Sequence, residues 1–273
     1  MKTRIISGAV AVALLITLLI VNGFWSPISV IAISILAALA SFEMLCNTGA
    51  VKSGIAILLA VLYSAVIQFS YAGILRIPSA LITVIYVILV ATVTLKEHET
   101  FKPDSVTMCL AMPILISYAF SSLEFLLNNG DGFGIFYLLM LLNFSSIADC
   151  CAYFTGVAIG KHKLAPVISP KKTIEGAVGG VLGAVVGTLV ICLIFNLVTD
   201  AKANILGLCL ITPLMAVIGI LGDLFTSAIK RCYGIKDYGN LMPGHGGVLD
   251  RCDSILLCAP VLALIVKYVE VIG

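Results

Sequence analysis

The amino-acid sequence predicts an all-α fold: a polytopic integral membrane protein with about nine transmembrane helices. Two observations lead to this prediction. Hydrophobic residues make up 61% of the 273 residues and the mean hydropathy is +1.17, whereas soluble domains contain roughly 45 to 50% apolar residues. These residues also form runs of roughly 17 to 25, the length that a helix needs to cross about 30 Å of hydrocarbon. We therefore expect one transmembrane domain over residues 1–273.

The apolar runs follow one another along the whole chain, with short polar breaks between them. The first run follows Lys2 and Arg4. It is longer than a signal-peptide core and lacks an A-x-A cleavage site, so we expect it to be retained as a span. The fourth run is short. The runs centre on about residues 14, 36, 61, 87, 114, 144, 188, 213 and 263, and the breaks lie at residues 25–27, 47–52, 73–78, 96–104, 128–132, 161–175, 200–203 and 230–253.

The basic residues give a test of this topology, because cytoplasmic loops of membrane proteins are enriched in Lys and Arg. With the N-terminus in the cytoplasm, all 16 Lys and Arg fall in cytoplasmic segments except Arg76, Lys202 and Lys267. We therefore expect the loops at about 161–175 and 230–253 to face the cytoplasm and Gly273 to lie outside. The net charge of only +2 gives no indication of nucleic-acid binding.

The stretch from Ser227 to Asp253, SAIKRCYGIKDYGNLMPGHGGVLDRCD, is far more polar than the rest of the chain. Lysine and arginine side chains neutralise phosphate oxygens, here Lys230, Arg231, Lys236 and Arg251. Carboxylates are the oxygen ligands that Mg²⁺ prefers, here Asp237, Asp250 and Asp253, with Asp223 just before. Glycines let the backbone turn tightly beside a ligand, here Gly246 and Gly247 next to His245. The stretch therefore predicts a nucleotide site with a metal ion.

Three of these acids also have a simpler interpretation. On a helix, Asp223 shares a face with Ser227, Lys230 and Arg231, so a structural ion pair with Lys230 or Arg231 is the alternative to metal binding. Asp250 could be a loop charge. Asp253 could serve as the N-cap of the last span.

A second polar block interrupts the apolar pattern between the sixth and seventh runs. It reads ISPKKTIEG from Ile168 to Gly176. A turn with hydroxyls that opens a helix is a favourable place for a phosphate, and the candidate substrate-binding residues are Ser169, Lys171, Lys172, Thr173 and Glu175. The alternative is that these lysines only set the topology. Upstream, Asp149 shares a helical face with Tyr153, Gly156 and Gly160, and it is either a substrate-binding acid or a buried acid paired with Tyr153.

Written as S-x-x-K-R-x-x-x-x-K-D-x-x-x-x-x-P-x-H-G-G-x-x-D-R-x-D, the stretch resembles the signature of the phosphatidate cytidylyltransferases. The ISPKKTIEG block and the residues around Asp149 resemble that family too, over roughly the C-terminal half. One departure is Thr226, where such proteins often carry Glu. The resemblance implies an enzyme of a bacterial inner membrane that converts CTP and phosphatidic acid into CDP-diacylglycerol and pyrophosphate. It implies Mg²⁺ held by Asp223 and Asp250, and it leaves a second, monovalent cation open.

Two other functions fit the same composition. A CTP-dependent lipid kinase would use similar metal and phosphate chemistry, and a transporter would also contain buried acids in many spans. The quaternary state is open as well. Gly179, Gly183 and Gly187 form a stripe of small residues that permits close helix packing. Packing within the chain is one interpretation, and the homodimer implied by the resemblance is the other.

Overall fold

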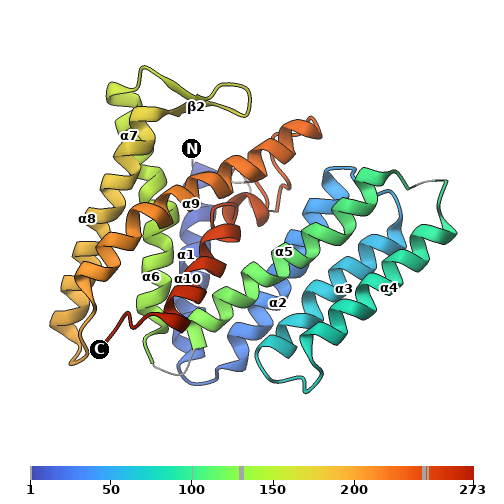
Figure 1. Cartoon of the computed structure of the whole chain (residues 1–273), viewed down its shortest axis with the longest axis horizontal. Helices are drawn as coiled ribbons and strands as arrows, with labels where there is room; N and C mark the ends of the chain where they lie inside the picture. Colours follow the sequence, from blue (N-terminus) through green and yellow to red (C-terminus); the bar gives the residue numbers. More distant parts are fainter. Residues whose placement is uncertain (1, 100, 129–131, 242–243, 245) are drawn as a thin grey trace. The chain divides into compact units, whose positions relative to one another are not determined.

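The computed structural model describes residues 2–99, 101–128, 132–241, 244 and 246–273, with no side-chain description for residues 2–7, 11 and 12. Most of these residues are helical, which confirms the predicted all-α class (Figure 1). The helices are α1 (Lys2–Asn22), α2 (Pro27–Phe42), α3 (Gly54–Tyr71), α4 (Ser79–Lys96), α5 (Pro103–Asn128), α6 (Gly134–Leu142), α7 (Ala148–Ile159), α8 (Ile174–Val198), α9 (Ile205–Cys232) and α10 (Ile255–Tyr268). Two π-helical turns, η1 (Glu43–Asn47) and η2 (Asn143–Ile147), and one 3₁₀ turn, η3 (Leu249–Arg251), complete the list.

Within the described ranges, seven helical stretches are long and apolar enough to cross a membrane. In two of them a π-helical turn continues an α-helix, which gives the uninterrupted spans Pro27–Asn47 and Gly134–Ile159. The remaining two predicted positions hold shorter apolar helices, Gly8–Asn22 and Ile255–Tyr268. At 1.5 Å per residue, the 14 residues of α10 extend only about 21 Å. The count of nine spans therefore stays a prediction.

One element was not predicted. The loop after α7 forms a small antiparallel hairpin of β1 (Lys163–Ala165) and β2 (Ser169–Thr173), with Lys163 opposite Thr173 and Ala165 opposite Ser169. β1 has only three residues, and β2, with the sequence SPKKT, lacks the alternation of apolar and polar residues by which a strand is recognised. The hairpin brings the ISPKKT residues to the start of α8.

The chain divides into two compact units. The N-terminal unit comprises residues 1–124 and 230–252. In its core α2 packs on α3, and the hydroxyls of Ser41 and Ser64 are hydrogen-bonded at 2.7 Å. The Tyr63 ring stacks on Tyr86 with 4.3 Å between centroids, so α3 also packs on α4. The Ser41 and Ser64 hydroxyls thus satisfy each other across two neighbouring helices, where no water is at hand to do so.

The C-terminal unit comprises residues 125–229 and 253–273, and its central contact is α7 against α8. Each glycine of the α8 stripe faces a side chain of the neighbouring helical stretch. A Cβ at Gly179 would collide with Thr155, and one at Gly183 with Cys151. The stripe is therefore used for packing within the chain, the first of the two interpretations. It is not a free face for a second copy.

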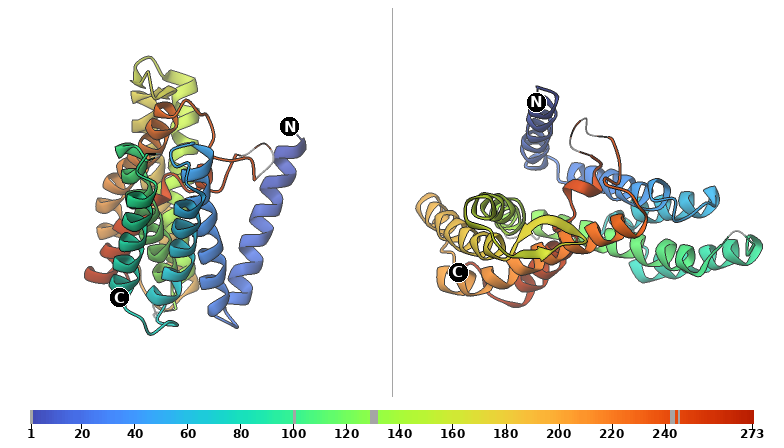
Figure 2. Two further views of the ribbon diagram at one scale, coloured as in Figure 1. Left: turned by 90° about the vertical axis from the view of Figure 1, so that its right-hand side faces the viewer. Right: turned by 90° about the horizontal axis from the view of Figure 1, so that it is seen from above.

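The two ends of this unit carry different features. The hairpin lies at one end of α7 and α8, and the C-terminus lies at the other (Figures 1 and 2). There Ala203 forms a β-bridge with Ile272, and Lys202 and Gly273 exchange backbone hydrogen bonds of 2.8 and 2.9 Å. The sequence-based topology requires residues 200–203 and Gly273 to lie on one side and the hairpin on the other, and this unit fulfils that requirement.

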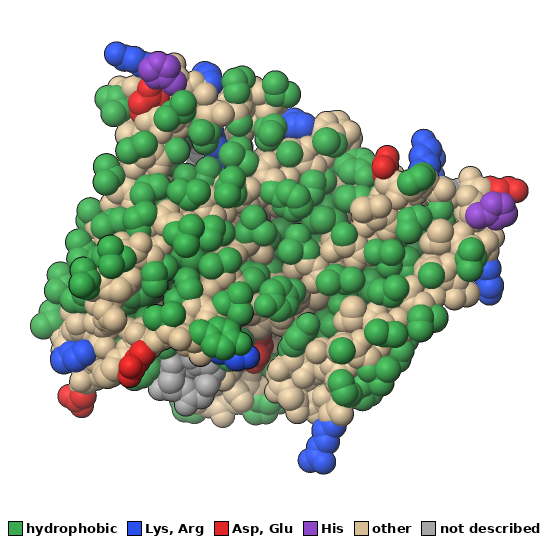
Figure 3. Space-filling model, viewed as in Figure 1, with side chains coloured by type: hydrophobic (Ala, Val, Ile, Leu, Met, Phe, Trp, Pro, Cys, Tyr) green, Lys and Arg blue, Asp and Glu red, His purple; other side chains and the backbone are tan. Residues whose placement is uncertain are grey.

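Side-chain distribution agrees with a lipid environment. In Figure 3 hydrophobic side chains cover most of the visible face, and most charged side chains gather near the ends of the helices. Along α8, Leu182, Val186 and Leu197 all point outward. Such outward apolar residues would be costly in water, whereas lipid accommodates them.

Candidate active site

The C-terminal unit contains a cavity of about 610 Å³, lined by α7, the β-hairpin, the start of α8 and part of α9. Its volume lies within the range of about 300 to 1,000 Å³ that is usual for small-molecule sites. The charged residues of the lining combine both signs: Asp149, Lys163, Lys171, Lys172 and Asp223. Three cations and two carboxylates within one cavity suit a ligand that carries phosphate together with a metal ion.

The α7 wall of this cavity matches the predicted helix face. Asp149, Tyr153, Gly156 and Gly160 all line the cavity, as their spacing indicates. The last two glycines permit close packing: a Cβ at Gly156 or Gly160 would lie 2.8 Å from the hydroxyl oxygen of Thr173. This close contact holds the end of β2 against α7, so the strand presents its lysines to the cavity.

The central contact of the cavity joins the two predicted blocks. The Nζ atom of Lys172 lies 2.5 Å from Oδ2 of Asp223, and the two side chains are 22% and 21% exposed. Asp223 also accepts a hydrogen bond of 3.2 Å from the Ser227 hydroxyl. Asp223 thus forms an ion pair with Lys172 of the hairpin, a partner that the sequence did not suggest.

Two further observations describe the surroundings of Lys172. Its Nζ atom is fully enclosed, and within the described part of the chain no hydrogen bond of normal geometry reaches this nitrogen. Asp149 is close enough to interact electrostatically with both Lys172 and Asp223. An ammonium group carries three N–H donors. Because Nζ is enclosed, its remaining donors can reach an acceptor in the cavity, such as a phosphate oxygen, only after the side chain shifts.

Thr173 and Glu175 hold the hairpin in place. Thr173 is the N-cap of α8, and its hydroxyl accepts a hydrogen bond of 3.1 Å from the Gly176 backbone N–H. Glu175 accepts backbone N–H bonds from Lys161 and His162, and its Oε1 lies 2.5 Å from Nδ1 of His162. Thr173 lines the cavity, whereas Glu175 and Ser169 do not. Their predicted contact with substrate stays a prediction.

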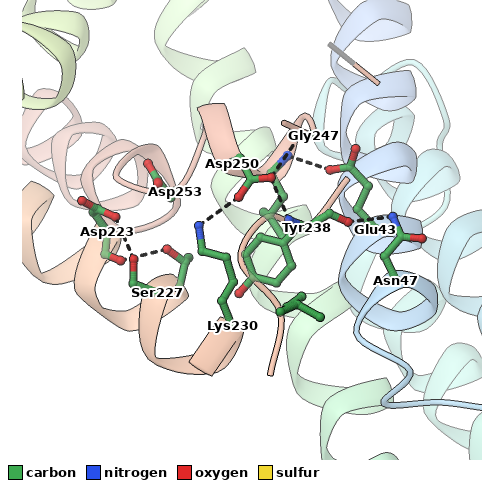
Figure 4. A network of polar contacts seen from close by, with 12 residues as sticks. Glu43, Asn47, Asp223, Ser227, Lys230, Tyr238, Gly247, Asp250 and Asp253 are labelled. Carbon is green, nitrogen blue, oxygen red and sulfur yellow. Dashed lines mark hydrogen bonds and ion pairs between the residues drawn. The ribbon is translucent and has the colours of Figure 1, made fainter. Parts of the chain in front are cut away.

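The signature loop, which we define as residues 233–251, lies in the N-terminal unit and is centred on Asp250 (Figure 4). Oδ1 of Asp250 accepts a hydrogen bond of 2.9 Å from Nζ of Lys230, and these side chains are 2% and 9% exposed. Oδ2 accepts the backbone N–H groups of Tyr238 at 2.7 Å and Gly247 at 3.0 Å. The carboxylate thus fixes two separate points of the loop.

The glycines of the loop are required by its geometry. Gly244 and Gly246 have φ angles of +79° and +86°, a region that residues with a Cβ rarely adopt. A Cβ at Gly246 would also lie 2.8 Å from Oδ2 of Asp250. The predicted tight turn is confirmed at these two residues.

The other predicted residues of the signature have varied positions. Four of them are exposed: Arg231, Lys236, Asp237 and Arg251. Oδ1 of Asp253 accepts a 2.7 Å hydrogen bond from the backbone N–H of Ser254, immediately before α10. Thr226 is buried and its hydroxyl bonds to the carbonyl groups of Gly222 and Asp223, so it serves its own helix. His245 lies outside the described residues.

The donor groups of the cavity fit a magnesium ion. No three His, Cys, Asp or Glu side chains converge into a ready metal cage in the ranges that the structure describes. Mg²⁺ does not need such a cage, because proteins usually hold it with one or two carboxylates together with water and substrate phosphates. Asp223 and Asp149 can supply those carboxylates. Asp250 already accepts three hydrogen bonds, and the roles of Asp250 and Asp253 as ligands stay predictions.

The sequence-based reasoning missed two residues of η1. Glu43 is only 5% exposed and accepts the backbone N–H groups of Val248 and Leu249. Nδ2 of Asn47 donates a hydrogen bond of 2.6 Å to the carbonyl group of Tyr238. The sequence held one indication, an acidic residue at the end of an apolar run. A charged side chain costs free energy in a membrane unless it has partners.

The sequence profile of the cytidylyltransferase family matches residues 2–269, almost the entire chain. The chain belongs to the cytidylyltransferase family. It is 35% identical over 267 residues to the phosphatidate cytidylyltransferase of Bacillus subtilis (strain 168), with 96% of each chain covered. The enzyme of the same name from Thermotoga maritima is 32% identical over 276 residues, which covers 99% of this chain and 97% of that relative.

A third relative, the phosphatidate cytidylyltransferase of Staphylococcus haemolyticus, is 31% identical over 270 residues, covering 97% of this chain and 98% of its own. The similarity therefore extends beyond the C-terminal half in which the motifs are recognised by eye. It includes the helices that carry Glu43 and Asn47, which places these residues within the family's shared length.

Proposed function

We propose that this family member transfers the cytidylyl group of CTP to phosphatidic acid, giving CDP-diacylglycerol and pyrophosphate. The observation that supports the proposal most directly is the enclosed Lys172 ammonium group, which lies 2.5 Å from Asp223 in a cavity with further lysines. The names of the three relatives supply the lipid substrate.

The proposed step is a displacement at phosphorus. An oxygen of the phosphatidic acid phosphate attacks the α-phosphorus of CTP, a new P–O bond forms, and the bond to the β-phosphate breaks to release pyrophosphate. A lipid phosphate is ionised near neutral pH, so the step needs no covalent enzyme intermediate and no dedicated general base. The protein's contribution is alignment of the reactants and neutralisation of charge.

Lys172 performs both tasks in this proposal. Its charge compensates a phosphate oxygen, and its ion pair with Asp223 fixes where the ammonium group lies. Lys171 and Lys163 add positive charge at the cavity wall. Mg²⁺, held by Asp223 with Asp149 nearby, would supply further neutralisation of the triphosphate. The phosphate contacts of Lys230, Arg231, Lys236, His245 and Arg251 are part of the same proposal, as expected from the signature.

We also propose that the active site faces the cytoplasm from a bacterial inner membrane. The Lys and Arg distribution favours cytoplasmic loops at 161–175 and 230–253. The pairing of Lys202 with Gly273, at the end of α8 remote from the hairpin, agrees with this orientation. CTP is a cytoplasmic metabolite, so only this orientation gives the cavity access to it.

The decisive experiment follows individual phosphorus atoms. Purified protein in detergent receives phosphatidic acid, Mg²⁺ and CTP labelled at either the α or the γ position. We expect the α label in a lipid product and the γ label in pyrophosphate. The γ label in lipid, with release of CDP, would assign a lipid kinase instead.

The Asp223→Asn variant is the matched control, because an amide keeps the shape of the carboxylate and removes its charge. We expect no lipid label from this variant. If the wild-type protein incorporates neither label, the transferase proposal fails, and a flux assay in proteoliposomes would then test transport.

A further inference from the structure

Glu43 lies far from the signature loop in sequence and is bonded to it in the structure. It is the first residue of η1, at the end of the α2 span. Its Oε1 accepts the backbone N–H of Val248 at 3.0 Å, and its Oε2 accepts that of Leu249 at 2.9 Å. Both carboxylate oxygens are therefore used, each by a different residue of the loop.

The loop is shaped to receive this carboxylate. A Cβ at Gly239 would lie 2.5 Å from Oε1 of Glu43, and one at Gly247 would meet both oxygens. Two stretches of the loop that are eight residues apart thus approach the same side chain. Asn47 adds a hydrogen bond of 2.6 Å from Nδ2 to the Tyr238 carbonyl. The π-helical turn η1 therefore holds the loop at Tyr238 and again at Val248 and Leu249.

The contacts of Glu43 and Asp250 interlock. Three consecutive backbone N–H groups point to carboxylate oxygens: that of Gly247 to Asp250, and those of Val248 and Leu249 to Glu43. These hydrogen bonds to charged acceptors belong to the stronger class in proteins. Their combined effect is to fix the direction in which Gly246, Gly247 and Arg251 are presented.

We propose that Glu43 is a positioning residue for nucleotide binding by the signature loop. It does not touch the substrate; it fixes the backbone of the segment that carries the predicted phosphate contacts. This inference rests on the proposed function, because it assigns the loop to CTP. The simpler alternative is that Glu43 only ties α2 to the loop for stability.

Substitutions at Glu43 distinguish a role of its two acceptor oxygens from a role in packing. In Glu43→Gln the volume is kept, but the amide has a single acceptor oxygen and an NH₂ group, so one backbone N–H would face another donor. Glu43→Asp keeps both acceptor oxygens and the charge on a shorter side chain. A positioning role predicts that Gln is the more harmful substitution, whereas a packing role predicts that Asp is.

The matched control is Ser41→Ala. Ser41 lies on the same helix, is fully buried, and bonds to Ser64 of α3 and not to the loop. All variants are purified as full chains in detergent, and their folding is compared by circular dichroism and melting temperature. Steady-state kinetics then give kcat and the KM values for CTP and for phosphatidic acid.

For Glu43→Gln we expect the KM for CTP to rise about tenfold to a hundredfold, with the KM for phosphatidic acid within about twofold of wild type. Glu43→Asp should lie between Gln and wild type, and Ser41→Ala should have wild-type KM values. A fall in activity that only follows the folded fraction, with both KM values unchanged, would overturn the positioning role. So would a Gln variant that behaves like wild type.

A second measurement separates this inference from the proposed function. CTP should raise the melting temperature of the wild-type protein, and the rise should be lost in Glu43→Gln and kept in Ser41→Ala. Wild-type protein that transfers no cytidylyl group would refute the proposed function alone. In that case the effect of CTP on the melting temperature still tests the positioning role. That role fails if CTP changes the melting temperature of the wild-type protein and of Glu43→Gln by the same amount.

Discussion

Replacement of Lys172 by Met removes the charge of the central cavity contact while it keeps an unbranched side chain. The structure gives the expected magnitude. Removal of one partner of a buried ion pair costs about 3 to 5 kcal/mol. The Lys172 and Asp223 side chains retain 22% and 21% exposure, so we take the lower end, about 3 kcal/mol. At about 2 to 4 °C per kcal/mol for a chain of this size, the apparent melting temperature should fall by about 6 to 12 °C.

The same loss should affect catalysis. If the 3 kcal/mol also applies to transition-state stabilisation, kcat/KM for CTP should fall by about a hundredfold. Lys171 is the natural comparison, because it is the adjacent residue and also lines the cavity, but it is exposed and no ion pair to Asp223 is found for it. Lys171→Met should therefore reduce kcat/KM less than about tenfold, with little change in melting temperature.

A double variant tests the physical reason. If the lost stability in Lys172→Met comes from the uncompensated Asp223 carboxylate, then Lys172→Met with Asp223→Asn should recover most of the melting temperature and remain inactive. Equal effects of the Lys171 and Lys172 substitutions on kcat/KM would refute the reasoning. A double variant that is even less stable than Lys172→Met would refute the electrostatic account of the pair.

Two further predictions concern the loop and the topology. Asp250→Asn should abolish turnover and make the signature loop more susceptible to trypsin. The reason is that an amide cannot accept the hydrogen bonds of Lys230, Tyr238 and Gly247 together. Full activity, or unchanged digestion, would contradict the role of Asp250 in the loop. A cysteine introduced at Lys171 or Lys236 should react with a membrane-impermeant label only from the cytoplasmic side. A cysteine introduced at Gly273 should react only from outside. A Gly273 cysteine that reacts from the cytoplasm would overturn the predicted topology.

The fold class and the positions of the helices could be predicted from the sequence, because apolar length is a direct physical requirement of the bilayer. Within the described residues, the predicted polar breaks fall at the ends of the long helices or between them, and the break at 161–175 holds the hairpin. Helical spacing also gave the correct face of α7, with Asp149 and Gly156 in the cavity. The hairpin was missed because β1 has only three residues and β2 has no alternation of apolar and polar residues.

Residue types indicated phosphate and metal chemistry, but not which charges would pair. Helical spacing put Asp223 beside Lys230 and gave no indication of its ion pair with Lys172 from the hairpin. Such a pairing depends on how α8 and α9 pack, which no local pattern records. Glu43 was missed for the same reason, because its partners are backbone N–H groups about 205 residues away. A sequence does not show which backbone N–H groups a side chain will bind.

The two π-helical turns have a consequence for how such chains should be aligned. A π-helical turn holds about one residue more than the α-helical turn that it replaces, because its hydrogen bonds join residues five apart and not four. In η1 the turn contains Glu43 and Asn47, and in η2 it contains Asn143, whose Nδ2 atom donates to Ala184 and Thr188 of α8. A relative with a one-residue gap in the middle of the span at either place would therefore lack the π-helical turn and these contacts.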